Sequence, residues 1–206
     1  MKKIDNEYLF IYTQKVKEKD PDKVTSIYRA TLERVSEVGL QGLKMAEIAK
    51  RAQIASGTLY LYFSSKEELL NSLYRQLKLQ QSYLKPVSQA ESALPLKLQL
   101  KAIWTQALKY RMAHYAEAFF LEQFARSPAL SEESKQVSDQ ITAHLLTLLE
   151  RAKAELIIKN LPNELLFCLL LGLLKETTSL CQAKQQDLDQ DLIENSFLLC
   201  WDALKA

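Results

Sequence analysis

Hydrophobic residues recur every three or four positions through most of this chain, which is the spacing that builds one buried face on an α-helix. The first helix is predicted to begin after Asp20, which can cap it with Pro21 at the first helical position, and to end at Gly39. Its apolar face is formed by Val24, Ile27, Tyr28, Thr31, Val35 and Val38. The pattern therefore predicts an amphipathic helix that packs through a single face.

The next stretch predicts two short helices joined by a tight turn. The first starts near Lys44 and repeats the helical spacing, and the second runs from about Ser56 to Tyr62. Small alanines lie where the two helices must approach closely, as a helix-turn-helix motif requires. We therefore predict a three-helix head over residues 21–66, preceded by a charged extension over residues 1–20.

A long helix is predicted to leave the head. Ser65 can cap its first turn and Glu68 can reciprocate, which is the arrangement of a capping box. Residues 67–85 then form a connecting helix into a helical body over residues 67–206. Prolines and capping residues in that body separate five further helices, expected at residues 95–113, 115–126, 131–159, 162–183 and 192–204. The predicted fold class is all-α, with an N-terminal helix-turn-helix head and a C-terminal helical bundle.

Composition supports this fold class. The chain has 206 residues, of which 48% are hydrophobic and 25% charged, so it is long enough to bury a real core. Four glycines and five prolines are few, and abundant Leu, Ala, Lys, Glu and Gln favour helices. Three of the four glycines, Gly39, Gly42 and Gly57, lie within the head. The chain is therefore expected to turn most sharply there.

Charge is distributed unevenly along the chain. Residues 1–85 carry 15 Lys and Arg against 10 Asp and Glu, whereas residues 86–206 carry 12 against 15. A basic first part suits a surface that faces nucleic acid. An ordinary solvated surface accounts for the same imbalance equally well, so charge alone does not decide the function.

The run IAKRAQIASGTLYLYFSSKEELL resembles the signature of the TetR family (TetR/AcrR-like) of bacterial transcriptional regulators. In that family a run of the form G-T-(L/I)-Y-x-Y-F-x-(S/N)-K-x-x-L-L closes the DNA-binding head. The matching positions are Gly57, Thr58, Leu59, Tyr60, Tyr62, Phe63, Lys66, Leu69 and Leu70. The resemblance covers about residues 22–80, and beyond residue 85 only helical architecture and length are similar.

The resemblance implies that the second short helix reads DNA. The candidate DNA-binding residues are Lys44, Ala55, Ser56, Gly57, Thr58, Tyr60, Leu61, Tyr62 and Lys66. Gly57 allows a close backbone approach, Thr58 offers a hydroxyl and a methyl group, and the tyrosines and Lys66 suit phosphate oxygens. Leu59 and Phe63 are expected to fill the core of the head instead.

Two positions depart from the family pattern. Family members often place Ser or Thr where Lys44 and Ala55 stand, and those side chains cap the two short helices. Ala55 cannot cap, so the second short helix is expected to have a weaker cap or to use Ser56. Ala55 and Leu61 also lack the long polar groups that recognise a base through two hydrogen bonds. Specificity is therefore expected to depend partly on DNA shape.

The resemblance further implies a body that binds a small effector and holds a homodimer together through its last two helices. Candidate dimer residues are Leu166, Leu169, Leu170, Leu173, Phe197, Cys200 and Trp201. Candidate effector-binding residues are Trp104, Tyr110, His114, Tyr115, Phe119, Phe120 and Phe124. Effector pockets are mostly apolar, but aromatic residues at helical spacing are also common in a plain core.

The function predicted first is a dimeric repressor that binds a palindromic double-stranded DNA operator and is released from it by a small-molecule effector. In an alternative, the same fold binds DNA while its body binds a protein partner, as nucleoid or division regulators do. An enzyme has little support, because His114 and His144 show no catalytic or metal-ligand spacing. We therefore expect no catalytic residues, no metal and no cofactor.

The cysteines and the longest apolar run indicate a cytoplasmic protein. Cys168, Cys181 and Cys200 are odd in number and lack any CxxC pairing, so reduced thiols are expected, with redox sensing as a minor alternative. The longest apolar run, residues 165–174, has about half of the roughly 20 residues needed to cross a bilayer. It is expected to be a buried helix segment.

Overall fold

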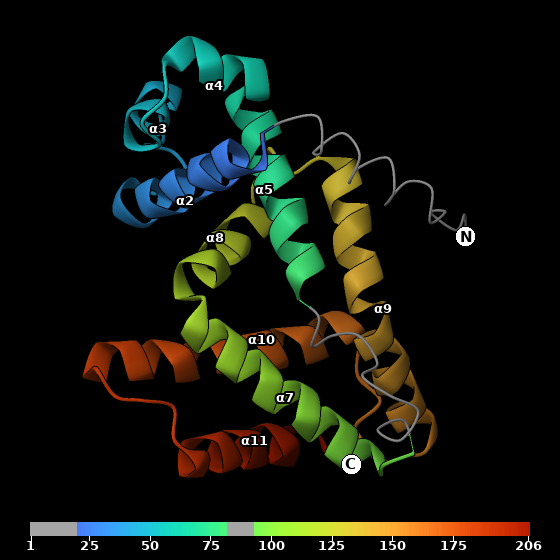
Figure 1. Ribbon diagram of the computed structural model, residues 1–206. Coiled ribbons are helices and arrows are strands. Elements are labelled where there is room, and N and C mark those ends of the chain that lie inside the picture. The colour runs from blue at the N-terminus through green and yellow to red at the C-terminus, as the bar shows by residue number, and fades with distance from the viewer. Residues whose placement is uncertain (1–19, 82–92) are drawn as a thin grey trace. The chain divides into compact units, whose positions relative to one another are not determined.

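A computed structural model describes residues 20–81 and 93–206, and within these ranges the chain is helical (Figure 1). The one β-type pairing among them is an isolated bridge between Ile158 and Lys205. The predicted all-α fold class is therefore confirmed. The extension before Asp20 and the last predicted residues of the connecting helix lie outside the described residues.

The chain divides into two compact units. The first unit contains residues 20–74 together with Phe119–Ser131, and the second contains residues 75–81 and 93–118 together with Glu132–Ala206. The predicted boundary at residue 66 falls inside the first unit, which also takes up a segment that lies far along the sequence. Each unit is described by itself below.

Besides residues 119–125, which belong to a helix described below, three helices and the beginning of a fourth build the first unit. These are α2 (Pro21–Val38), α3 (Met45–Arg51), α4 (Ser56–Tyr62) and α5 (Lys66–Gln80), which continues into the second unit. Asp20 caps α2 as predicted, because its carboxylate accepts a hydrogen bond from the backbone N–H of Asp22 at 3.1 Å. Gly39 ends α2 with a φ of 68°, a conformation that glycine adopts at little cost.

Asn71 holds the distant segment Phe119–Ser131 to α5 within the first unit. Its side-chain amide donates to the carbonyl oxygen of Ala129 at 2.8 Å and accepts from the backbone N–H of Ser131, also at 2.8 Å. The rings of Tyr74 and Phe124 lie 5.7 Å apart in the same region. These contacts explain why a segment that is far away in sequence belongs to this unit.

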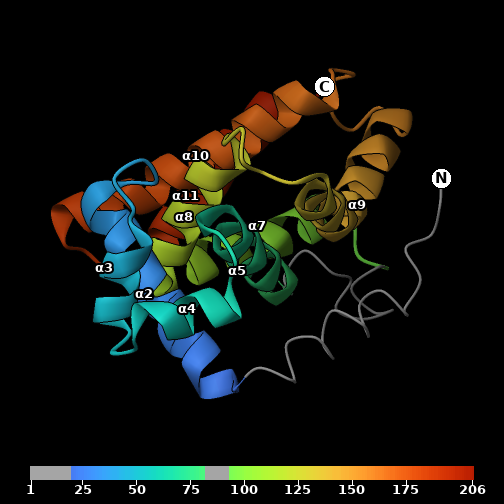
Figure 2. The same cartoon turned by 90° about the horizontal axis from the view of Figure 1, so that it is seen from above.

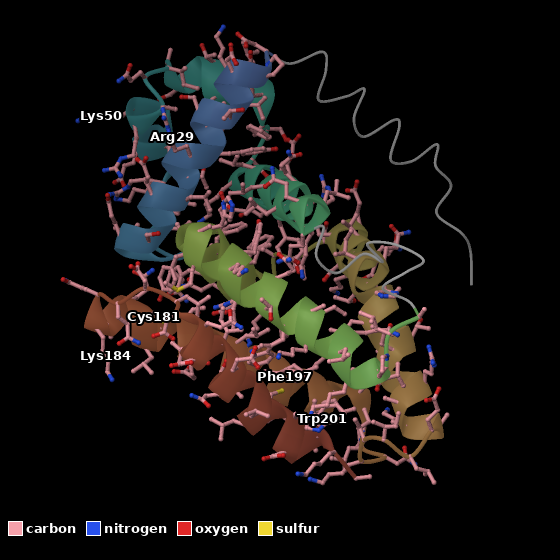
Figure 3. All side chains as sticks on the ribbon, turned by 60° about the horizontal axis from the view of Figure 1, so that its bottom comes forward. Arg29, Lys50, Cys181, Lys184, Phe197 and Trp201 are labelled. Atoms are coloured by element: carbon pink, nitrogen blue, oxygen red, sulfur yellow. The ribbon has the colours of Figure 1, made fainter. Side chains whose placement is uncertain are left out.

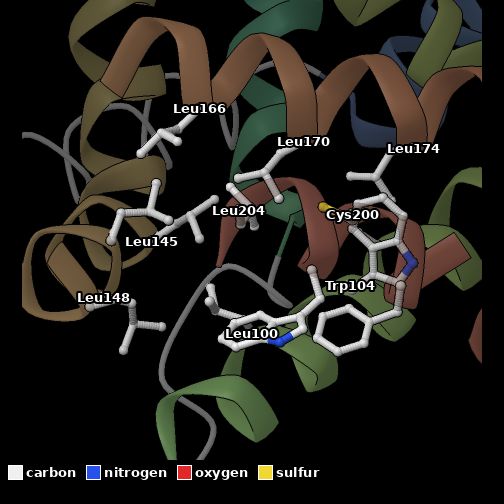
Figure 4. Packing of buried hydrophobic residues seen from close by; sticks show 14 of the residues in the cluster. Leu100, Trp104, Leu145, Leu148, Leu166, Leu170, Leu174, Cys200 and Leu204 are labelled. Carbon is white, nitrogen blue, oxygen red and sulfur yellow. The ribbon is translucent and has the colours of Figure 1, made fainter. Parts of the chain in front are cut away.

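The second unit contains the longer helices. They are α7 (Leu96–Ala113), the start of α8 (Tyr115–Ala125), α9 (Glu132–Ala154), α10 (Asn163–Lys184) and α11 (Gln190–Leu204). Helix α7 packs against α9, α10 and α11, and α10 packs against α11 (Figure 1). Leucines from these helices surround Trp104 and Cys200 in one hydrophobic cluster (Figure 4). Within it, the Trp104 indole N–H donates to the hydroxyl of Ser196 at 3.1 Å.

Three of the helices are followed by a left-handed residue that is not glycine. Gln53, Leu156 and Gln185, which follow α3, α9 and α10, have φ values of 57°, 56° and 51°. After each of them a backbone N–H reaches back five residues, for example from Ile54 to the carbonyl oxygen of Ala49 at 3.0 Å. This pattern is a Schellman motif, which usually has glycine at the left-handed position. Because that signal is missing, α9 was predicted to run to residue 159, whereas it ends at Ala154.

Candidate nucleic-acid interface

Helix α4 packs against the rest of the first unit through one side only. Leu59 is fully buried and is the one buried residue of this helix, while Phe63, directly after it, is 2% exposed. On the neighbouring helix, Ile48 is also fully buried, and α3 and α4 pack together. Seen from above in Figure 2, α4 lies in front of the rest of the unit. Leu59 and Phe63 therefore belong to the core of the unit, where they were expected.

The opposite side of α4 is a strip of four exposed residues, Ser56, Gly57, Tyr60 and Leu61. Their spacing of one and four positions places them on one helical face. The side chain of Tyr60 is 51% exposed and that of Leu61 is 83% exposed. Thr58 and Tyr62 flank this strip and are half-buried. The strip carries no charged side chain and no amide.

Neither short helix is capped by a side chain. Lys44 precedes α3 and Ala55 precedes α4, and both have extended backbone without a side-chain hydrogen bond to the helix. Ser56 does not replace Ala55 as the cap of α4. The Lys44 side chain is 75% exposed, with its ammonium 3.9 Å from the carboxylate of Glu47. Its charge is therefore accessible at the start of α3.

Lys66 begins α5 and also holds the turn before α3. Its ammonium donates to the carbonyl oxygen of Leu43 at 3.4 Å, which leaves two of its three hydrogens for other acceptors. The predicted capping box is present in altered form. Ser65 accepts from the backbone N–H of Glu68 at 3.1 Å, while the Glu68 carboxylate accepts from the N–H and hydroxyl of Ser64, both at 2.6 Å. Ser64 was not identified from the sequence.

Ion pairs between α2 and α3 neutralise part of the basic charge. Arg34 pairs with Glu37 and Glu47, and Arg51 lies 2.6 Å from Glu37 and 3.3 Å from Glu33. Arg51 and then Arg34 hold the pKa of the Glu37 carboxyl below its usual value. The described residues of the first unit carry eight basic and eight acidic side chains. The basic excess of residues 1–85 therefore does not come from the described residues of this unit.

Several exposed cations nevertheless lie on the helices of the first unit. Figure 3 shows Arg29 on α2 and Lys50 on α3, and both side chains are exposed. Together with Lys44 they place positive charge on the helices that accompany α4. A short helix with an uncovered outer face, beside a second helix and exposed cations, is the arrangement of a DNA-binding helix-turn-helix.

Two family models match almost all of the described chain. The model for bacterial regulatory proteins of the tetR family matches residues 27–73, which include α3, α4 and parts of α2 and α5. The model for the tetracyclin repressor-like C-terminal domain matches residues 95–205. The chain belongs to the TetR family. The predicted family, the helix-turn-helix and the role in regulating transcription are thereby confirmed.

Individual relatives agree with this assignment. An uncharacterized HTH-type transcriptional regulator of Haemophilus influenzae is 23% identical over 188 residues, which are 89% of this chain and 96% of that protein. Four other curated regulators match over 55–61 residues, so the chain spans only 28–31% of their length. All of these relatives are described as regulators, and none of their names describes an enzyme.

Solved structures support the fold over nearly the whole chain. A TetR family transcription regulator from Marinobacter aquaeolei has a TM-score of 0.79 at 23% identity, covering 92% of this chain and 98% of that one. The transcriptional regulator FadR from Bacillus subtilis, solved in complex with stearoyl-CoA, has a TM-score of 0.62 at 22% identity, covering 87% and 98%. At this identity the likeness concerns the fold.

The candidate effector-binding residues of this TetR family member fall into two groups. Phe119, Phe120 and Phe124 belong to the first unit, where Phe120 and Phe124 are fully buried and stack 5.5 Å apart. Trp104, Tyr110, His114 and Tyr115 belong to the second unit, where Trp104 is 2% exposed in the core. Trp104, Phe120 and Phe124 therefore belong to the hydrophobic cores of their units.

The second-unit group contains a small polar cluster at the junction of α7 and α8. The rings of Tyr110 and His114 stack 4.6 Å apart. One carboxylate oxygen of Glu117 lies 2.9 Å from His114 Nδ1 and accepts from the Tyr110 hydroxyl at 3.3 Å. Tyr115, which follows His114 in the sequence, is half-buried. The sequence did not identify Glu117, although its spacing of three from His114 on a helix was available.

The candidate dimer residues mostly face the core of their own subunit. Leu166, Leu170, Phe197, Cys200 and Trp201 are between 0% and 9% exposed, and Figure 3 shows the last helix with Phe197 and Trp201. Leu169 and Leu173 are half-buried. The exposed apolar side chains of the same two helices are Leu165, Leu171, Leu180, Leu198 and Leu199. The buried residues of α10 recur at positions 166, 170, 174 and 177, which is the spacing of one helical face. The exposed leucines of α10 lie at other positions of the helix.

The three cysteines are free thiols with different surroundings. Cys168 is exposed on α10, while Cys181 and Cys200 are fully buried. Burial raises the pKa of the Cys200 thiol to about 12. Because the thiolate is the reactive form, Cys200 is poorly suited to redox sensing. None of the described helices is both long and apolar enough to cross a membrane.

Proposed function

We propose that this chain is a repressor that binds a palindromic operator as a homodimer in the cytoplasm and leaves it when a small effector binds. The uncovered strip on α4 is the observation that carries the DNA-binding part. A helix that buries only Leu59 and leaves Ser56, Gly57, Tyr60 and Leu61 exposed has one face available for the major groove.

Phosphate contacts are expected around that strip. Lys44 is 75% exposed at the start of α3, and the Tyr60 hydroxyl lies on a half-exposed side chain. Thr58 and Tyr62 lie on α4 beside the strip, and Lys66 follows at the start of α5. Such contacts fix the position of a protein on DNA without reading the sequence, so they are expected to strengthen binding to all duplexes alike.

The exposed apolar residues of α10 and α11 support the homodimer. Leu165 and Leu171 are 54% and 58% exposed on α10, and Leu199 is 67% exposed on α11. Apolar side chains that a subunit leaves uncovered on two adjacent helices favour association with a second copy, because four helices can bury what two cannot. The dimer contact is accordingly assigned to these leucines, with Leu169 and Leu173 beside them.

A dimer brings two α4 helices to one duplex. Half-sites about 34–36 Å apart place both recognition helices in successive major grooves on the same side of DNA. An effector that binds a conformation with a different separation shifts the population away from the DNA-binding form. The regulators named among the relatives favour this mechanism over a body that binds a protein partner.

The effector is expected to contact the second unit near Tyr110, His114 and Tyr115, which keep accessible surface. The B. subtilis FadR complex makes stearoyl-CoA the first compound to test. If it is an effector, adding it to the protein–DNA complex releases the duplex, whereas coenzyme A alone does not. Retention of the duplex in both cases excludes long-chain acyl-CoA.

The DNA-binding proposal is tested with a labelled duplex from upstream of the gene for this protein. Specific binding should weaken as salt rises, because phosphate contacts release counterions. Lys44→Ala should lower the slope of log affinity against log salt by about one unit. Lys135→Ala, which removes an exposed lysine of α9 instead, is the control and should leave the slope unchanged. Salt-independent binding, or equal loss in both variants, contradicts the proposal.

The homodimer is tested by sedimentation velocity. Leu199→Glu places a charge within the exposed apolar residues of α11 and should convert the dimer to a monomer. Leu98→Glu makes the same change on α7, at a leucine that is 45% exposed and lies outside α10 and α11, and should leave a dimer. A Leu199→Glu protein that remains dimeric overturns this assignment of the interface.

A further inference from the structure

Leu61 has the most exposed side chain among the large hydrophobic residues that the structure describes. It is 83% exposed on α4, whereas its neighbour Leu59 is fully buried. The two leucines differ by two helical positions, so the backbone of one short helix directs one side chain inward and the other outward. An exposed leucine leaves apolar surface in water, which is unfavourable compared with burial.

The surroundings of Leu61 indicate what covers it. The strip on α4 consists of Ser56, Gly57, Tyr60 and Leu61, so it offers two hydroxyl groups and no guanidinium, ammonium or amide group. Arginine, lysine, asparagine and glutamine are the residues that recognise guanine and adenine through paired hydrogen bonds. The strip therefore lacks the groups for that type of recognition and has a large apolar side chain in their place.

The major groove exposes one apolar group that distinguishes the bases. The C5-methyl group of thymine projects into it, while guanine, cytosine and adenine present hydrogen-bond donors and acceptors there. We propose that Leu61 is a specificity-determining residue that contacts the C5-methyl group of a thymine in each half-site of the operator. This inference rests on the proposed function, because it requires α4 to lie in the major groove.

Charge favours DNA over a protein partner as the occupant of this strip. Lys44 just before α3 and Lys50 on α3 are exposed, as is Arg29 on α2. Basic side chains on the helices beside an apolar strip match a duplex, whose phosphates flank the groove that exposes the thymine methyl groups. Leu61 itself carries no charge, so its contribution should depend on base sequence and be independent of salt.

The experiment begins with in vitro selection of duplexes by the full-length protein from a random-sequence pool. Each thymine of the selected half-site is then replaced by deoxyuridine, which removes only the C5-methyl group and keeps the base pair. Dissociation constants are measured by fluorescence anisotropy for the wild type and for Leu61→Ala. Thermal unfolding followed by circular dichroism establishes that the exposed substitution leaves the fold intact.

One thymine per half-site is expected to respond. Replacing it should weaken wild-type binding by about threefold to tenfold, and should weaken Leu61→Ala binding by less than about twofold, because the contact is already absent. Leu61→Met keeps an apolar side chain and should retain most of the response. Tyr60→Phe, which removes a hydroxyl from the same strip, should retain all of it.

Two results overturn the assignment of Leu61 while leaving DNA binding intact. In one, a selected duplex shows equal deoxyuridine effects in the wild type and in Leu61→Ala. In the other, no thymine responds, or Leu61→Ala binds the selected duplex as tightly as the wild type, so that Leu61 serves a different contact. If no sequence is enriched and no salt-sensitive binding occurs, the proposed function itself is overturned together with this inference.

Discussion

Helices α4 and α11 belong to different units and differ in length, in capping and in how many of their residues are buried. Helix α4 is short, has no side-chain cap and buries only Leu59. Helix α11 is capped by Asp189, which accepts from the backbone N–H of Leu192 at 2.7 Å, and it buries six residues. Isolated helices as short as α4 are unstable in water, so α4 forms because its neighbours hold it.

This difference separates residues that build the fold from residues that are free to bind. Most of α4 is exposed, so substitutions on its outer strip are expected to change binding and leave stability nearly unchanged. The inner face of α11 is closed by α7 and α10, so substitutions there are expected to act through stability. Four substitutions test this comparison, in order of decreasing effect on the free energy of unfolding.

Trp104→Ala should have the largest effect. Trp104 is 2% exposed, its ring centroid lies 6.5 Å from that of Phe197, and it donates a hydrogen bond to Ser196. Removing it leaves a cavity and takes away one of the two hydrogen-bond partners of the Ser196 hydroxyl, which should lower the free energy of unfolding by about 3–5 kcal/mol in urea titration. Leu98→Ala on the same helix is the control and should cost less than about 1 kcal/mol. Equal losses would contradict the burial of Trp104.

Leu59→Ala removes the one buried contact of α4. The lost burial and the cavity should lower the free energy of unfolding by about 2–4 kcal/mol. Because α4 is held mainly by this side chain, DNA binding should fall as well, even under conditions where the protein stays folded. Hydrogen exchange of the α4 backbone amides measures the loosening directly. Unchanged exchange rates in this helix would show that other contacts hold it.

Gln53→Gly should stabilise the turn between α3 and α4. Gln53 has a φ of 57°, which costs an L-residue with a side chain about 1 kcal/mol and costs glycine much less. Glycine also gains freedom in the unfolded chain, so the net increase in the free energy of unfolding should be about 0.5 kcal/mol. Thermal unfolding measures it, and a decrease would mean that the Gln53 side chain makes a contact that outweighs the backbone cost.

Gly57→Ala should have the smallest effect on stability and a clear effect on function. A Cβ atom at this position meets no atom within 4 Å, so the substitution fits the free protein, and because Gly57 lies in the first turn of α4 the gain in helix propensity should stay below about 0.5 kcal/mol. In the DNA complex the added methyl group occupies the space between backbone and groove, and affinity should fall by about tenfold. Wild-type affinity for the operator would show that the α4 backbone does not approach DNA there.

Local sequence signals predicted many of the helix boundaries. Asp20 and Gly39 bound α2, Pro95 and Pro162 precede α7 and α10, and Asp189 caps α11. These signals work because capping and proline geometry involve only a few neighbouring residues. The family signature worked for the same reason, since it lies on one continuous segment from α3 to α5.

The sequence by itself determined that the chain is helical, that it contains a helix-turn-helix and that Leu59 and Phe63 face inward. Only the tertiary structure decided that α9 ends before Leu156, that Phe119–Ser131 joins the first unit, and which leucines of α10 remain exposed. The first set depends on contacts between residues within a few turns of one another. The second depends on packing between segments far apart in sequence, where an apolar residue such as Leu61 or Leu166 shows its role only once its neighbours are known.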